Sequence, residues 1–290
     1  MERLDLEKLK KSKSTEELIK FGIINIDKPS GPTSFMISQY VKSALNLNKT
    51  SHLGTLDPQV SGVLPIALGR ACRLNDYLMN RNKTYVGIMR LHKDIIEKEL
   101  RRVINDFIGK IMQLPPIKSN VKRALRQREI ISFDILEISG NDILFKTEVQ
   151  AGTYIRKLCS DIGEKIGGAH MLELRRVAAG SFNELESINL YDFDKIIEEY
   201  KKGDDKLLRK AIIPGEIVAN LNPIVHIDKQ VVKKVLTGSP IFPKFLSDEK
   251  EIKDLNKDDK ICIFSDKNFI GCYNFIGDKN IVAVPEFVFN

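Results

Sequence analysis

An aspartate, Asp57, stands at the centre of the stretch with the most unusual residue choices in this sequence, Ser51-His-Leu-Gly-Thr-Leu-Asp-Pro58. Pro58 disfavours helical geometry at the residue before it, so we expect the Asp57 carboxylate in a loop or extended backbone. Its apolar neighbours indicate the edge of a core, where desolvation and one cationic partner set the ionisation of a carboxylate. Such a group is a candidate for catalysis. Taken alone, however, an Asp-Pro pair is more typical of a turn.

Two further segments carry residues that could work with this carboxylate. Lys83-Thr-Tyr85 brings an aromatic ring with a polar tip into a strand-like run, where it could stack on a nucleic-acid base or pack in the core. Gly152-Thr-Tyr-Ile-Arg-Lys-Leu158 places Tyr154 and Arg156 at the start of a helix. The guanidinium fork of Arg156 could hold a carboxylate ionised.

A run of cations between the two segments suggests a polyanionic partner. Few acidic residues near this run balance its positive charge. Its members are Lys118, Lys122, Arg123, Arg126 and Arg128. Such clustering predicts a surface that contacts phosphates, and a solvated helix face is the alternative.

The hydropathy pattern predicts the elements that position these residues. We expect a strand over 21–26, a helix over 35–45 capped by Thr33 or Ser34, an amphipathic helix over 94–109 that ends at Gly109, two strands within 130–150, and a helix over 154–166 that ends at Gly167. From about residue 220 a smaller unit follows. Its predicted elements are strands over 224–227, 261–264, 269–275 and 281–284 and a helix over 228–236.

The composition is that of a cytoplasmic, soluble globular protein. The 290 residues are 42% hydrophobic and carry a net charge of +7, which is compatible with nucleic acid. The four cysteines and four histidines lack zinc-like spacing, so we expect no metal site. No apolar run is long enough to span a membrane, and the charged N-terminus does not resemble a secretory signal.

Ten short motifs then match one known family in order, over about 150 residues. They are Gly22–Pro29, Gly31–Ser34, His52–Pro65, Gly69-Arg70, Lys83–Tyr85, Pro115-Pro116, Val121–Arg123 with Arg126, Gly152–Leu158, Gly168–Met171 and Leu174–Arg176. With them the sequence resembles the TruB/dyskerin pseudouridine synthases, and specifically their archaeal form, the catalytic subunit of the H/ACA ribonucleoprotein. Ser51, Leu53 and Asn120 depart from the family pattern and put only local loop geometry in doubt.

The resemblance implies a catalytic role for Asp57 in converting uridine to pseudouridine. The reaction breaks the N1–C1′ bond and joins C5 to C1′, so no cofactor is expected. Tyr85 matches the tyrosine that packs on the target base, and Arg156 matches the arginine that pairs with the carboxylate. The other matching pocket residues are Lys28, His52, Tyr154 and Leu174.

The same resemblance implies an α/β fold of the α+β type, with a mixed, mainly antiparallel sheet and a small C-terminal module. We expect an N-terminal arm over 1–20 that packs on that module, a catalytic domain over 21–215, and a β-barrel-like, RNA-binding PUA domain over 216–290.

The setting of the reaction depends on one segment. Bacterial relatives carry a Thr-x-Thr-x-Asp-x-x-Gly signature where this chain reads Met89–Glu97. Its loss favours a guide-dependent enzyme that acts on rRNA or tRNA with an H/ACA guide RNA, small Gar-like and Nop-like proteins and a kink-turn-binding ribosomal-type protein. A stand-alone tRNA pseudouridine synthase is the alternative. A non-catalytic RNA-binding scaffold is a third reading, against which intact Asp57, Tyr85 and Arg156 argue.

Overall fold

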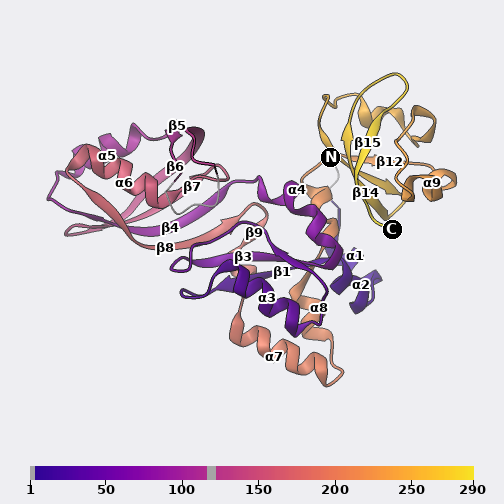
Figure 1. The fold of residues 1–290 in the computed structure, drawn as a ribbon, viewed down its shortest axis with the longest axis horizontal. Helices are drawn as coiled ribbons and strands as arrows, with labels where there is room; N and C mark the ends of the chain where they lie inside the picture. The colour runs from indigo at the N-terminus through magenta and orange to yellow at the C-terminus, as the bar shows by residue number, and fades with distance from the viewer. Residues whose placement is uncertain (1–3, 116–121) are drawn as a thin grey trace. The chain divides into compact units, whose positions relative to one another are not determined.

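The computed structural model describes residues 4–115 and 122–290, which form two compact units. The larger unit consists of Ile24–Ile66 and Leu78–Ala211. The smaller unit combines the N-terminal segment through Ile23 with Ala67–Tyr77 and Ile212–Asn290. Since each unit draws on separate stretches of chain, residues distant in sequence come together in both (Figure 1).

A mixed sheet with the strand order β10-β1-β3-β8-β4-β7-β6-β5 forms the basis of the larger unit (Figure 1). Its strands are β1 (Gly22–Lys28), β3 (Ser61–Leu68), β4 (Lys83–Leu91), β5 (Gly109–Gln113), β6 (Arg126–Ser139), β7 (Asp142–Val149), β8 (Ala169–Ala179) and β10 (Ile188–Asn189), with the short strands β2 (Thr50–His52), β9 (Phe182–Asn183) and β11 (Ile212–Pro214) paired at its side. The β1–β10 and β3–β8 pairs are parallel. Strand β4 pairs antiparallel with both β7 and β8, and β6 pairs antiparallel with β7. The predicted mixed α/β fold is therefore confirmed.

The helices begin and end at local signals in the sequence. They are α1 (Leu6–Ser12), α2 (Thr15–Lys20), α3 (Ser34–Ala44), α4 (Asn75–Met79), α5 (Glu97–Asn105), α6 (Ile155–Ile166), α7 (Leu190–Lys201), α8 (Lys206–Ala211) and α9 (Val232–Leu236). Thr33 caps α3 by accepting a hydrogen bond from the Met36 amide. Gly167 ends α6 in the left-handed conformation at φ 88°. Both boundaries agree with the prediction.

The helix predicted over 94–109 is wrong at both ends. Helix α5 covers only Glu97–Asn105, and its N-cap, Ile96, already has extended backbone and makes no side-chain capping bond. Ile96 is 75% exposed and Ile108 is 43% exposed, so the apolar repeat continues past the helix without being buried. Gly109 does adopt a positive φ of 98°, but there it begins β5 rather than capping a helix.

The smaller unit is built on a four-stranded sheet in the order β12-β13-β14-β15. Its strands are β12 (Ile224–His226), β13 (Lys260–Ser265), β14 (Asn268–Phe275) and β15 (Ala283–Val288). The strand predicted over 281–284 is thus displaced along the chain. Pro285 lies inside β15, which is possible because β15 is an edge strand and needs no amide hydrogen there. The helix predicted over 228–236 is a 3₁₀ turn, Lys229–Val231, followed by α9.

Residues of the N-terminal segment contribute to the core of the smaller unit. Ring contacts join Phe21 to Phe269 at 5.5 Å and to Phe289 at 4.4 Å. Between α1 and α2, the Lys13 ammonium forms an ion pair with Glu216, whose side chain is only 3% exposed. Because a buried carboxylate needs a charged partner, this pair fastens the segment to the unit.

Replacement of Lys13 should destabilise the smaller unit. In a Lys13→Met variant the Glu216 carboxylate stays buried without its partner, a change that costs about 3–5 kcal/mol in similar buried pairs. We expect the free energy of unfolding, measured by chemical denaturation, to fall by about that amount.

The matched control is Lys229→Met, which removes the exposed partner of Asp266 at 2.7 Å. Exposed pairs are worth about 0–1 kcal/mol, so this variant should unfold almost like the wild-type protein. Equal losses in the two variants would contradict a special role for the Lys13–Glu216 pair.

Candidate active site

Asp57 lies in the loop between β2 and β3, in the non-helical backbone that Pro58 predicts. Leu53, Leu56 and Val60 of the same loop are buried and anchor it in the core. The Asp57 side chain points outward and is 52% exposed. The loop therefore presents a carboxylate to the surface from a firmly packed base.

Helix α3 and the segment before it hold this loop through backbone groups. The buried Ser34 hydroxyl accepts from the Leu56 amide at 2.8 Å and donates to the Leu56 carbonyl at 3.0 Å. The Gly31 amide donates to the Pro58 carbonyl at 2.8 Å. Hydrogen bonds therefore fix the residues on both sides of Asp57. The sequence indicates Ser34 only as a motif residue and a possible helix cap. Its contact with Leu56 depends on tertiary structure, so no local signal predicts it.

Lys28 lies beneath the loop rather than in an open pocket. Its fully buried ammonium donates to the carbonyls of Pro29, Pro32 and Pro58, at 2.8, 2.9 and 3.0 Å. Burial, and secondarily the charge of Arg176, lowers the pKa of Lys28. With all three of its protons donated to carbonyls, this side chain supports the loop from the inside.

The structure brings Arg156 to Asp57. Arg156 lies in the first turn of α6, and its Nη2 forms an ion pair with Oδ2 of Asp57. Both side chains are about half exposed, at 50% and 52%. Gln113 on β5 fixes the start of the helix, since its side chain accepts from the Tyr154 amide at 3.0 Å and donates to the Tyr154 carbonyl at 3.2 Å. Sequence reasoning missed this role of Gln113.

Tyr85 and Leu174 come from neighbouring strands of the sheet. Both are largely buried, Tyr85 on β4 and Leu174 on β8. Tyr85 is the cross-strand partner of Arg176, and Leu174 that of Gly87. A Cβ at position 87 would come within 2.8 Å of the Leu174 side chain, so glycine leaves the room that Leu174 occupies.

His52 lies on β2, a few residues before Asp57 in the chain. Its Nε2 is 3.1 Å from the Thr55 hydroxyl. Burial, and then the charge of Arg176, lowers the pKa of His52. A neutral imidazole is therefore favoured here at neutral pH.

Two buried cations that the sequence analysis names only as motif residues, without a role in the site, lie behind this arrangement. Arg176 on β8 is 1% exposed, and Lys83 at the start of β4 is also buried. Burial, and secondarily Arg176, lowers the pKa of Lys83 to about 8. The sequence did contain a signal, because Arg175 and Arg176 are adjacent in a strand and must point to opposite faces.

The basic run is only partly described. Lys118 lies outside the described residues, and Lys122 and Arg123 are exposed just before β6. Arg126 and Arg128 lie in β6, so a solvated helix face does not apply to them. Arg128 donates to the Gly152 carbonyl at 3.0 Å and thereby connects the run to the loop before α6.

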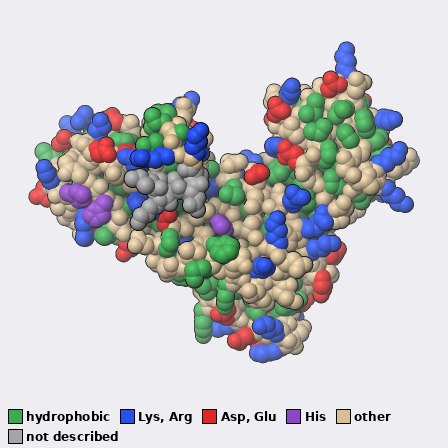
Figure 2. All heavy atoms as spheres, in the orientation of Figure 1, with side chains coloured by type: hydrophobic (Ala, Val, Ile, Leu, Met, Phe, Trp, Pro, Cys, Tyr) green, Lys and Arg blue, Asp and Glu red, His purple; other side chains and the backbone are tan. Residues whose placement is uncertain are grey.

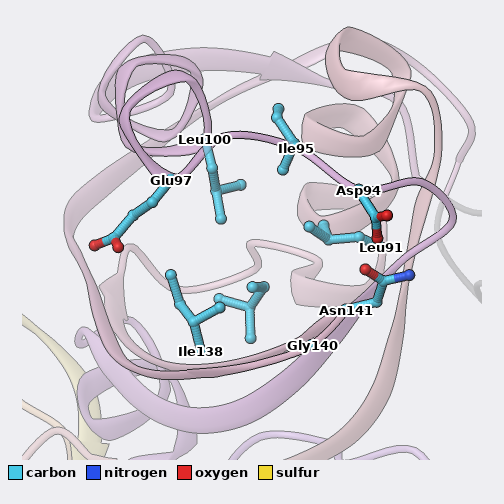
Figure 3. A pocket seen from close by; sticks show the side chains of 9 residues that line it. Leu91, Asp94, Ile95, Glu97, Leu100, Ile138, Gly140 and Asn141 are labelled. Atoms are coloured by element: carbon cyan, nitrogen blue, oxygen red, sulfur yellow. The ribbon is translucent and has the colours of Figure 1, made fainter.

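Other chemistry is not assembled near Asp57 in the described part of the chain. No group of three potential metal ligands occurs among the described residues. A cavity of about 150 Å³ lies between α5 and the β6–β7 turn, where Leu91, Leu100 and Ile138 point toward one another (Figure 3). None of the proposed site residues lines it. Among residues 4–115 and 122–290, no helix is long and apolar enough to cross a bilayer.

Comparison with known proteins identifies the class. Residues 42–155 match the family described as "TruB family pseudouridylate synthase (N terminal domain)". Residues 156–219 match "tRNA pseudouridylate synthase B C-terminal domain". The fold and the matched families thus define an enzyme that isomerises uridine in RNA.

Individual relatives agree with this class. "Probable tRNA pseudouridine synthase B" of Methanothermobacter thermautotrophicus is 45% identical over 228 residues, which are 78% of this chain and 70% of the relative. The protein of the same name from Methanopyrus kandleri is 45% identical over 241 residues, 82% of this chain and 71% of the relative. The chain belongs to the TruB family of pseudouridine synthases, and the predicted resemblance is confirmed.

Solved structures show the same relationship. A chain in "Crystal Structure of a Cbf5-Nop10-Gar1 Complex" superposes with a TM-score of 0.88 at 38% identity and covers 97% of this chain and 88% of its own length. A chain in "Structure of H/ACA RNP bound to a substrate RNA containing 2'-deoxyuridine" gives a TM-score of 0.85 at 35% identity, with 97% and 89% covered.

The buried amine of Lys83 should make the stability of the protein depend on pH. Between about pH 8 and pH 10.5 this amine is protonated in the unfolded chain and largely neutral in the folded chain. The unfolded state then binds more protons, so the free energy of unfolding rises with pH through this window. Below pH 8 the folded protein carries the full cost of a buried ammonium, about 3 kcal/mol at 1.36 kcal/mol per pKa unit.

The measurement compares the wild-type protein with a Lys83→Met variant by chemical denaturation at several pH values. Relative to the variant, the wild-type protein should gain stability from pH 8 to 10.5. A constant difference across the window would mean that Lys83 keeps its ordinary pKa.

Proposed function

We propose that Asp57 is the catalytic carboxylate with which this chain converts uridine to pseudouridine in RNA. The observation that carries the proposal is the ion pair between Asp57 and Arg156, formed at the surface of a loop whose backbone is fixed on both sides. A charged partner favours the ionised form of a carboxylate. Asp57 is thus held ready to react and accessible to a large substrate.

The reaction requires a group that acts at the sugar. The N1–C1′ bond breaks, a new bond joins C5 to C1′, and the proton of C5 is replaced by one at N1, so the product is an isomer of the substrate. An ionised Asp57 either attacks the sugar or removes a proton from it. In both cases a nearby carboxylate also stabilises the positive charge that develops on the sugar as the N1–C1′ bond breaks. Atoms and electrons balance without a co-reactant, in keeping with the expectation that no cofactor takes part.

The remaining pocket residues are proposed to receive the base. Tyr85 and Leu174 lie largely buried on adjacent strands and offer one aromatic and one aliphatic surface. Extraction of a base from its stack costs a few kcal/mol, which contacts in the pocket offset. Since Asp57 is half exposed without RNA, the substrate itself must exclude water from the site. Tyr154 and His52 complete the proposed pocket, and the basic run through Arg128 is proposed to contact phosphates.

We further propose that the chain works in an H/ACA ribonucleoprotein. The similarity to the Cbf5 chains spans 97% of the residues and therefore includes both units. The expected partners are a guide RNA, a target rRNA or tRNA, small proteins like Nop10 and Gar1, and a kink-turn-binding ribosomal-type protein. The smaller unit is proposed to act as the RNA-binding PUA module, with residues 1–20 as its N-terminal arm. We also propose a cytoplasmic location, because Cys159, Cys262 and Cys272 are buried thiols outside disulfides, as is usual in a reducing compartment.

A second candidate is a stand-alone tRNA enzyme. The printed names of the relatives from Methanothermobacter thermautotrophicus and Methanopyrus kandleri favour tRNA as the substrate. The direct passage from β4 to α5, without room for the bacterial signature, favours the guide-dependent form.

An Asp57→Asn substitution should abolish pseudouridine formation while the protein stays folded. The amide keeps the shape of the side chain but lacks the charge, so we expect the rate to fall about a thousandfold or more. The measurement is release of tritium from RNA that contains uridine labelled at C5, because this hydrogen leaves during the reaction.

The matched control is Asp142→Asn, which removes the carboxylate of another exposed Asp–Arg pair in the larger unit, with Arg90. This variant should retain the wild-type rate. Product from Asp57→Asn at the wild-type rate would refute the catalytic assignment. An inactive wild-type chain, with guide and partners present, would support the RNA-binding scaffold instead.

The requirement for a guide separates the two candidate settings. With tRNA alone we expect little product, and with an H/ACA guide and partner proteins we expect product at the uridine that the guide selects. Mapping of pseudouridine in the target RNA provides the measurement. Full activity on tRNA without guide would favour the stand-alone enzyme.

A further inference from the structure

Arg176 occupies the centre of the sheet beneath the proposed site. Its strand, β8, lies between β3 and β4 in the sheet. Arg176 is in register with Gly62 on β3 and with Tyr85 on β4. The side chain is 1% exposed, so it does not contact RNA. It lies between the strand that follows the Asp57 loop and the strand that carries Tyr85.

The guanidinium binds the part of the site that carries Asp57 and lies beside the part that carries Tyr85. Its Nε donates to the Val63 carbonyl at 2.8 Å, and its Nη2 donates to the Gly54 carbonyl at 2.9 Å, three residues before Asp57. Tyr85 is the cross-strand partner of Arg176, so its side chain lies beside the guanidinium on the same face of the sheet. The donors of a planar guanidinium point in fixed directions and hold their acceptors in one geometry, whereas the ammonium of a lysine rotates on a flexible stem.

Two glycines make room for this arrangement. A Cβ at position 62 would lie 2.1 Å from the Arg176 carbonyl oxygen, so only glycine lets β3 approach β8 so closely. A Cβ at position 54 would lie 3.3 Å from Nη1 of Arg176. Both glycines have positive φ angles, of 105° and 106°. The backbone around the guanidinium is therefore shaped to enclose it.

A buried cation without a carboxylate is costly, and this one has none. Within the described part of the chain no ion pair includes Arg176, and its hydrogen-bond acceptors are the carbonyls of Val63 and Gly54. An apolar side chain of similar size is often as stable as a buried charge. Stability alone therefore does not account for an arginine at this position, and its contacts point to the site.

We propose that Arg176 is a positioning residue for pseudouridine formation, which fixes the Asp57 loop and Tyr85 at the spacing that the reaction requires. This inference rests on the proposed roles of Asp57 and Tyr85. The carboxylate belongs to the loop before β3 and the base-stacking ring to β4. Arg176 lies between them, because it binds the loop and is in register with Tyr85. A misplacement of about 1 Å in such a pair can reduce a rate about 100-fold.

The test uses Arg176→Lys, which keeps the charge and most of the length but loses the fork. We expect kcat to fall about 10-fold to 100-fold with RNA affinity within about twofold of wild type, since Arg176 touches no RNA. The control is Arg175→Lys on the neighbouring residue, whose guanidinium pairs with Asp27 and Glu184 on the other face of the strand. This control should retain the wild-type kcat.

A double variant tests the connection to Tyr85. If Arg176 acts through Tyr85 and the loop, the effects of Arg176→Lys and Tyr85→Phe on kcat should be less than additive. Fully additive effects would overturn this part of the proposal. An unchanged kcat in Arg176→Lys, or a protein that no longer folds, would assign Arg176 to folding alone and overturn the proposal entirely.

Hydrogen exchange of residues 53–60 provides a readout that does not depend on activity. In Arg176→Lys the amides of this loop should exchange faster than in the wild-type protein, while those of α7 stay unchanged. Should the wild-type chain form no pseudouridine, the proposed function fails, yet faster exchange would still support positioning of the loop. Unchanged exchange would contradict it.

Discussion

The proposed site depends on one constraint. The exposed carboxylate of Asp57 must be held in place by hydrogen bonds that buried side chains make to the backbone of its loop. The loop of Asp57 contains no helix or strand, and the turn bond from the Val60 amide to the Asp57 carbonyl leaves other loop carbonyls to be bound from outside. Ser34, Lys28 and Arg176 supply the missing partners, each by binding a carbonyl of the loop. The central part of the large sheet, together with the start of α3, thus serves to hold eight residues in place.

Positive charge is the second common property of this support. Lys28, Lys83 and Arg176 are all buried, and each has a lowered pKa because burial disfavours the charged form. The N–H groups of these three side chains donate to carbonyls and not to a carboxylate, so their positive charge is not neutralised. An anion is consequently favoured above them, where Asp57 lies and where an RNA backbone would approach. The same side chains therefore provide geometry and electrostatic potential.

Local signals in the sequence were sufficient for much of the fold and for the residues at the surface of the site. Thr33 capped its helix, Gly167 ended α6, and β7 buried alternate residues as expected. The ends of α5 and the position of β15 were not predictable, because exposure of Ile96 and the edge position of Pro285 follow from tertiary packing. Lys28, expected in the pocket, and Arg176, named only as part of a motif, lie inside the protein. Their acceptors are backbone carbonyls that only the tertiary structure brings to them.

The smaller unit has a consequence for biosynthesis, since its core joins the first part of the chain to the last. Phe21 packs on Phe269 and Phe289, and Lys13 pairs with Glu216. A ribosome makes Phe21 long before it makes these partners, whereas every residue of the larger unit precedes Ile212. The larger unit can fold while synthesis continues. Phe21, in contrast, cannot pack on its ring partners until residues 269–289 have been made, so the N-terminal segment completes its packing much later than it is synthesised.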